Sequence, residues 1–247
     1  MDRPAGMGTR TGTITTRMID GQPLLRLLQI ASPALPIGAY AYSQGLEAAV
    51  AAGWVRDEPS AARWILGLLE GSLATLDLPV LARVHAAWGA GDRAGARRWS
   101  SLLYASRPTA ELQAEERHLG WALARVVASQ GLADVQVLVD EAQEGSGGGL
   151  AYAAVFAVAC QVWRIPAPAA LSAFAFAWVE AQVGAALRLV PLGQTAGQRI
   201  LRAAVEVVPA VVAAALALPD DDIGAAAPAH AIASARHETQ YARLFRS

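Results

Sequence analysis

Lysine is missing from this sequence: all 20 basic residues of the 247-residue chain are arginine. Its absence excludes every chemistry that needs an ε-amine, including a Schiff base, the lysine of a phosphate-binding loop and a Ser-Lys dyad. The arginines form no cluster, and the formal net charge is −1. Because nothing here attracts a phosphate backbone, we expect no binding to nucleic acid.

Sulfur and imidazole ligands are scarce. The single cysteine, Cys160, lies in an apolar run, so no intramolecular disulfide can form and a buried, unreactive thiol is expected. The four histidines are scattered, and no two are three or four residues apart on one helical face. We therefore expect no metal ion and no cofactor. The acidic run Asp220–Asp222 remains an alternative place for a cation, although such runs are more often solvated loops.

Catalytic motifs are also lacking. No serine lies in a Gly-x-Ser-x-Gly setting. His237 and Glu238 begin like a zinc-protease helix, but a tyrosine stands where the second histidine ligand is needed. We expect Glu115 and Glu116 to face solvent, and the glycine-rich run Gly145–Gly149 to be a flexible connection. The sequence therefore predicts a protein that is not an enzyme.

Hydrophobic residues make up 54% of the chain, and much of that fraction is alanine, the strongest helix former. The charge-free stretches Leu150–Trp163 and Ile165–Val179 fall short of the roughly 18 to 20 apolar residues of a membrane-spanning helix. We expect buried helices there and no membrane insertion. Residues 1–22 lack the apolar core of a secretory signal, so we expect a disordered leader and a cytoplasmic protein.

Apolar residues at helical spacing dominate the remainder. Ile65, Leu69 and Leu73 belong to one such stripe, and Asp57 with Pro59 marks the start of its helix. Other helices are expected at 24–31, from 43, and at 78–88, 93–105, from 110, 150–162, 166–187, 191–218 and 228–246. This pattern predicts an all-α fold in which residues 23–247 form a single compact bundle of about ten helices.

A loop rich in proline and tyrosine joins the first two predicted helices. Pro33 and Pro36 stiffen this loop, and Gly38 permits a backbone conformation that other residues resist. Tyr40 and Tyr42 follow, and rigid aromatic side chains make good contact anchors. An ordinary connection would be more polar, so the loop is a candidate contact surface.

The end of the chain, 228–246, is predicted to be a helix with two different sides. One side carries His237, Tyr241, Leu244 and Phe245, and the opposite side carries Arg236, Arg243 and Arg246. Two interpretations remain open. The aromatic side docks on the protein's own core, or the arginines and aromatic residues together bind a partner protein.

Four blocks of sequence share their motifs with a known family. They are 31–47 (ASPALPIGAYAYSQGLE), 106–117 (SRPTAELQAEER), 187–198 (LRLVPLGQTAGQ) and 231–247 (AIASARHETQYARLFRS). In this order they closely resemble the motifs of the UreF family of urease accessory proteins, and the resemblance runs from about Leu24 to the end.

The resemblance implies an all-α homodimer that helps to insert nickel into urease. It implies a complex with the accessory protein UreD (also called UreH) and with UreG, the nickel-carrying GTPase, that docks on apo-urease. It also associates Tyr40, Arg188 and Arg243 with the surface that faces the GTPase. Together with the residues singled out above, the candidate partner-binding set is Tyr40, Tyr42, Arg188, Arg236, Tyr241, Arg243 and Phe245. The alternative is a subunit that binds nickel itself or stimulates GTP hydrolysis with Arg243 as an arginine finger.

Overall fold

The computed structural model describes residues 21–132, 135, 151–224 and 227–247, and within these ranges every regular element is a helix. The α-helices are α1 (Gly21–Ala31), α2 (Leu46–Ala51), α3 (Glu58–Leu68), α4 (Leu78–Gly89), α5 (Arg93–Ala105), α6 (Ala110–Ser129), α8 (Tyr152–Val162), α9 (Ala167–Leu189), α10 (Gln194–Ala217) and α11 (Pro228–Glu238). Short 3₁₀ helices are η1 (Ala39–Ala41) and η3 (Asp220–Asp222), and η2 (Leu69–Asp77) is a π-helix. The all-α prediction is confirmed. The predicted glycine-rich connection and nearly all of the predicted leader lie outside the described residues.

A continuous rod of helix, α3–η2–α4, replaces the two helices predicted for this region. Its start is as predicted, because the Asp57 carboxylate accepts a hydrogen bond from the Ser60 amide at 2.9 Å and Pro59 lies in the first turn. Its middle is the π-helical segment, a form often found at functional sites. The segment ends at Asp77, a buried acid that belongs to the charge cluster described below.

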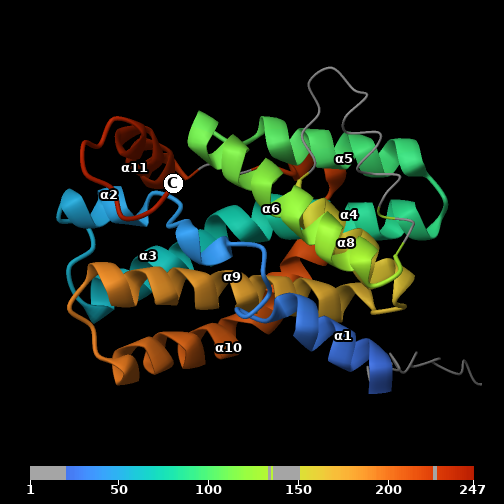
Figure 1. Ribbon diagram of the computed structural model, residues 1–247, viewed down its shortest axis with the longest axis horizontal. Helices are drawn as coiled ribbons and strands as arrows, with labels where there is room; N and C mark the ends of the chain where they lie inside the picture. The colour runs from blue at the N-terminus through green and yellow to red at the C-terminus, as the bar shows by residue number, and fades with distance from the viewer. Residues whose placement is uncertain (1–20, 133–134, 136–150, 225–226) are drawn as a thin grey trace, which may run out of the picture.

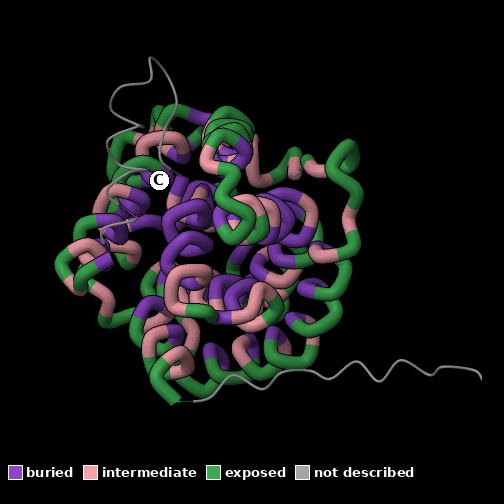
Figure 2. The backbone as a smooth tube through the Cα atoms, turned by 90° about the vertical axis from the view of Figure 1, so that its right-hand side faces the viewer, coloured by how far each residue is buried: buried purple, intermediate pink, exposed green. Residues whose placement is uncertain are grey.

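The core lies around α4 and α8, which pack against each other in the middle of the protein. α8 is apolar on all sides, and eight consecutive residues, Ala153–Cys160, are buried. Figure 2 shows this buried interior wrapped by helices with exposed outer faces. Burial raises the pKa of the Cys160 thiol, which agrees with the inert thiol predicted from the sequence.

The other helices surround this core in layers (Figure 1). α9 and α10 lie side by side along one edge, and α5 and α6 lie along the opposite edge. The short helices α2 and α11 pack together at one end, close to the C-terminus. This arrangement brings the loop before α2, the end of α9 and the tail of the chain to the same end of the protein.

Three helices of the described part of the chain are long and apolar enough, by length and composition alone, to cross a membrane: Glu58–Gly89, Ala167–Leu189 and Gln194–Ala217. In the first, 72% of the most apolar window is buried within the protein, whereas in the last only 33% is buried. Helix packing therefore accounts for most of the apolar surface of the rod, but not for that of α10. The absence of membrane insertion stays a prediction.

Candidate partner-binding site

The predicted contact loop is shaped by one glycine and held by one arginine. Gly38 adopts a left-handed conformation with φ 79°, which lets the chain turn into η1 and leaves the Tyr40 side chain 70% exposed. The Arg188 guanidinium, at the end of α9, donates a hydrogen bond to the Tyr40 carbonyl oxygen at 3.2 Å. The same guanidinium lies 5.9 Å from the centroid of the Phe245 ring. Arg188 thus joins the loop, α9 and the tail.

The tail is not a helix after Glu238, so the predicted helix 228–246 is wrong over its last turns. The physical reason is that a side-chain carboxylate accepts the hydrogen bonds of backbone amides that would otherwise continue the helix. The buried carboxylate of Glu47 accepts hydrogen bonds from the Leu244 amide at 2.8 Å and from the Phe245 amide at 2.9 Å. Further on, the Ser43 amide donates to the Ser247 carbonyl oxygen at 3.0 Å. The Leu244 and Phe245 amides, which a helix would pair internally, are bonded here to a side chain of α2, and the end of the chain is bonded to the loop before α2.

Because the tail is not helical after Glu238, the predicted arrangement of its side chains is also wrong. His237 and Phe245 are buried, whereas Tyr241 and Leu244 are exposed, so the four do not share one side. The tail docks by its backbone and by Phe245, and it leaves Tyr241 fully in solvent.

Two acids and a histidine fix the base of the tail. His237 is fully buried, with Nδ1 2.6 Å from Glu111 and Nε2 3.3 Å from Glu47. Glu111 also forms an ion pair with Arg243, whose side chain stays 40% exposed. Arg243 therefore lies at the surface but is tied to the first turn of α6.

The remaining predicted residues occupy different surroundings. Tyr42 is buried, and its hydroxyl lies 3.2 Å from Nδ1 of His118. Arg236 lies on α11 with its guanidinium 5.2 Å from the Trp54 ring centroid, and the structure shows no contact between it and Tyr40 or Arg188. The structure thus brings Tyr40, Arg188 and Phe245 together, and it places Arg236 apart from them.

A buried charge cluster behind the loop was missed by the sequence analysis. The Arg107 guanidinium pairs with Asp77 at the end of η2 and with Glu116 on α6, at 2.7 Å from the latter. Glu116 also accepts a hydrogen bond from the Tyr152 amide at 2.7 Å, which ties α6 to the start of α8. The signal was present, because Glu116 falls four residues after Leu112 on the buried stripe of α6.

Glu115 and Glu116 are buried, so the prediction that they face solvent is wrong. Glu115 has no arginine in direct contact among the described residues. Its carboxylate accepts hydrogen bonds from the Gln44 side-chain amide at 2.7 Å and from the Ser247 hydroxyl at 2.6 Å. Desolvation raises the pKa of Glu115 to about 7. This one residue therefore connects α6 to both the loop and the tail.

Within the described ranges, no three His, Cys, Asp or Glu side chains lie close enough together to hold a metal ion. In the acidic run, Asp220 forms an ion pair with Arg83 at 2.7 Å. This ion pair holds η3 against α4, so Asp220 has a structural role.

Comparison with known proteins shows to which family the chain belongs. The UreF family model matches residues 55–205. The urease accessory protein UreF of Alkalilimnicola ehrlichii is 46% identical over 234 residues, which are 95% of this chain and 100% of the relative. UreF of Azoarcus sp. is 49% identical over 229 residues, covering 91% and 96% of the two chains. UreF of Chromohalobacter salexigens is 47% identical over 228 residues, covering 92% and 96%. The chain therefore belongs to the UreF family of urease accessory proteins.

Proposed function

We propose that this chain is a urease maturation factor that acts through protein surfaces and has no catalytic site of its own. Together with UreD/UreH, it recruits the GTPase UreG to apo-urease and couples GTP hydrolysis to the assembly of the nickel centre. It works in the cytoplasm as a homodimer. Family membership supports the link to urease, and the convergence at Arg188 of an exposed tyrosine loop, α9 and the tail supports a protein-binding surface.

The exposure of Tyr40 is the observation that carries this proposal. A large aromatic side chain that is 70% exposed, on a loop held by Arg188, costs little entropy when a partner covers it. Arg243 and Tyr241 extend the surface along the tail. Tyr42 and Phe245 are buried, so their contribution is to hold the loop and the tail in position.

Tyr40→Ala is expected to weaken the binding of UreG by more than about tenfold, because it removes a central aromatic contact. The binding of UreD is expected to be unchanged. The binding of both partners is measured by co-purification with the tagged full-length protein. The proposed homodimer is tested separately, because light scattering of this protein alone should then give twice its chain mass of 25.7 kDa. Tyr104→Ala on α5 is the matched control. Retention of UreG by Tyr40→Ala at the wild-type level would contradict this assignment.

A second candidate function is direct stimulation of GTP hydrolysis by Arg243. The observation in its favour is the partial exposure of that guanidinium, and the observation against it is the ion pair with Glu111, which already uses it for tail docking. We expect Arg243→Lys to change UreG binding and GTP turnover together, each by less than about threefold, since an ammonium retains the charge.

Steady-state GTP hydrolysis by UreG at saturating concentrations of each variant is the decisive measurement. Arg246→Lys, another exposed tail arginine, is the control. A loss of about a hundredfold or more in turnover with intact binding would instead establish an arginine finger.

A further inference from the structure

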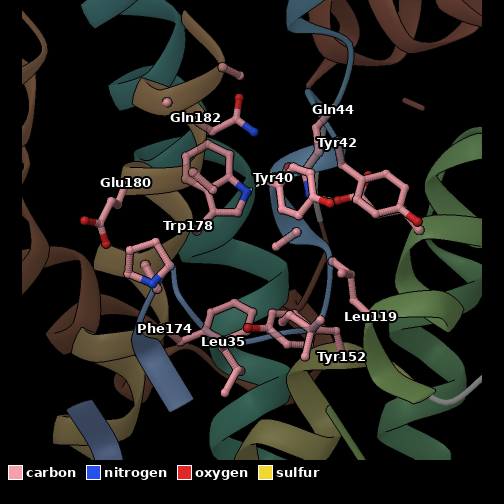
Figure 3. Close-up of a pocket in the computed structure, with 18 of the residues that line it drawn as sticks. Leu35, Tyr40, Tyr42, Gln44, Leu119, Tyr152, Phe174, Trp178, Glu180 and Gln182 are labelled. Carbon is pink, nitrogen blue, oxygen red and sulfur yellow. Dashed lines mark hydrogen bonds between the residues drawn. The ribbon is translucent and has the colours of Figure 1, made fainter. Parts of the chain in front are cut away.

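Behind the contact loop lies a cavity of about 450 Å³ that opens toward solvent between the loop, α6, α8 and α9. Small-molecule sites in proteins usually have volumes of about 300–1,000 Å³, and this cavity falls within that range. Aromatic rings surround it: Trp178 and Phe174 from α9, Tyr152 from α8, and Tyr40 and Tyr42 from the loop (Figure 3). The walls are therefore suited to a compact apolar body.

The lining of the cavity contains more carboxylates than guanidiniums. The lining includes the carboxylates of Asp77, Glu115, Glu116 and Glu180 but only the guanidiniums of Arg107 and Arg188. Arg107 is shared between Asp77 and Glu116. Glu115 receives only neutral donors, from Gln44 and Ser247. Arg107 also attracts the Glu115 carboxylate but forms no ion pair with it, so a cation beside Glu115 would stabilise the ionised form of that acid.

Two buried acceptors, one in the wall of the cavity and one in a separate small space beside it, find no hydrogen-bond donor among the described residues. One is Oε1 of Gln182, a side chain that is only 2% exposed and lines the cavity. The other is Nε2 of His230, in a small space that shares the wall of Glu115 and Arg107. Burial, assisted by Arg107, lowers the pKa of His230 to about 4, so its ring is neutral near pH 7. Buried acceptors without donors are rare and call for a ligand or water that donates.

We propose that this cavity binds a small organic cation, an ammonium or guanidinium group carried on a compact apolar body. The aromatic walls favour such a group by apolar contact and by cation–π attraction. The lining supplies the Glu115 carboxylate and the free Oε1 acceptor of Gln182 for its N–H groups. A bare metal ion fits less well, since no three ligating side chains converge in the described residues. The cavity shares Tyr40, Tyr42 and Arg188 with the candidate partner-binding surface, but binding of a small cation to the isolated protein does not depend on the maturation function.

Benzylamine is a suitable probe, because it joins an aromatic ring to a primary ammonium group. Calorimetric titration into full-length protein at pH 8 is expected to give a dissociation constant of about 1 mM, as is typical for a ligand of this size. Its neutral and anionic counterparts, benzyl alcohol and benzoate, are expected to bind at least tenfold more weakly. Equal binding of benzyl alcohol would overturn the proposal, because the cavity would then be only an apolar site.

Two substitutions locate the binding. Glu115→Gln removes the charge and keeps the shape, and it should weaken benzylamine about tenfold or more. Ala181→Phe fills the cavity from α9 and should abolish binding, which keeps the test valid if Glu115→Gln were to misfold. Glu206→Gln, an exposed acid on α10, is the control and should bind as the wild type does. Unchanged binding in Glu115→Gln and Ala181→Phe would overturn the proposal.

The pH dependence supplies an independent readout. Glu115 faces Glu116 and Arg107 in the buried cluster, with Asp77 and His230 nearby. With a pKa of about 7, Glu115 is mostly protonated at pH 6 and mostly ionised at pH 8. A bound cation favours the ionised form, so affinity should rise about tenfold between those pH values. A flat profile, or uptake of nickel chloride alone with no binding of benzylamine, would overturn the proposal. None of these outcomes depends on UreG or UreD.

Discussion

Replacing Arg107 by alanine is expected to lower the free energy of unfolding by about 3–5 kcal/mol, which is the usual cost of breaking a buried ion pair from one side. The Arg107 side chain is only 15% exposed, and its partners Asp77 and Glu116 are less exposed still. Removal of the guanidinium leaves two carboxylates close together in the interior. Urea unfolding followed by circular dichroism at pH 7 measures the effect.

A control substitution of an exposed arginine and a double-mutant cycle show whether the loss of stability comes from breaking the buried ion pairs or from removing any arginine. Arg117→Ala, which removes an exposed hydrogen bond to the Tyr104 hydroxyl, should change stability by less than about 0.5 kcal/mol. In an Asp77→Asn background, Arg107→Ala should cost distinctly less than it does alone. A loss below about 1 kcal/mol for Arg107→Ala alone would show that the cluster does not stabilise the fold.

Glu47→Ala is expected to release the tail. The substitution removes the acceptor of the Leu244 and Phe245 amides, and it deprives the buried His237 of one of its two acidic neighbours. Trypsin should then cleave after Arg243 at least tenfold faster than in the wild type, because cleavage requires the tail to leave the surface.

Mass spectrometry of the digest identifies the cleavage site. Glu58→Ala is the control, since it removes a carboxylate that pairs with Arg199 at the surface, far along the chain from the tail. Glu47→Gln retains one amide oxygen as an acceptor and should be intermediate. Equal cleavage rates for Glu47→Ala and the wild type would show that the tail is held by Phe245 packing and not by the carboxylate.

Local signals made most of the fold predictable. The cap at Asp57 and the apolar stripe after it predicted the start and the buried face of α3, because both depend on neighbours a few residues away. The tail was not predictable in this way. The acceptor that ends its helical hydrogen bonding, Glu47, lies 198 residues before Phe245 in the chain, so no local pattern reveals it.

The candidate site likewise has one part that the local sequence predicts and one part that depends on residues distant in the chain. The exposed Tyr40 follows from the proline- and glycine-rich loop before it, which the sequence marks clearly. The burial of Glu115 and Glu116 was mispredicted because two adjacent acids are usually solvated, whereas here Arg107 and Gln44 reach them from other elements. Glu116 lies four residues after Leu112, which places it on the buried side of α6. The prediction of solvent exposure followed from the charge of the residue and not from its position on the helix.

The π-helical segment η2 sets the register of the central rod. A π-turn holds one residue more than an α-turn, and each residue of an α-helix advances the side-chain direction by about 100°. Because a π-turn takes up more residues than an α-turn, the same nine residues wound as ordinary α-helix would leave Asp77 facing another direction, away from Arg107. The wide turns of η2 therefore set the side on which the rod meets the buried charge cluster and the direction in which α4 begins.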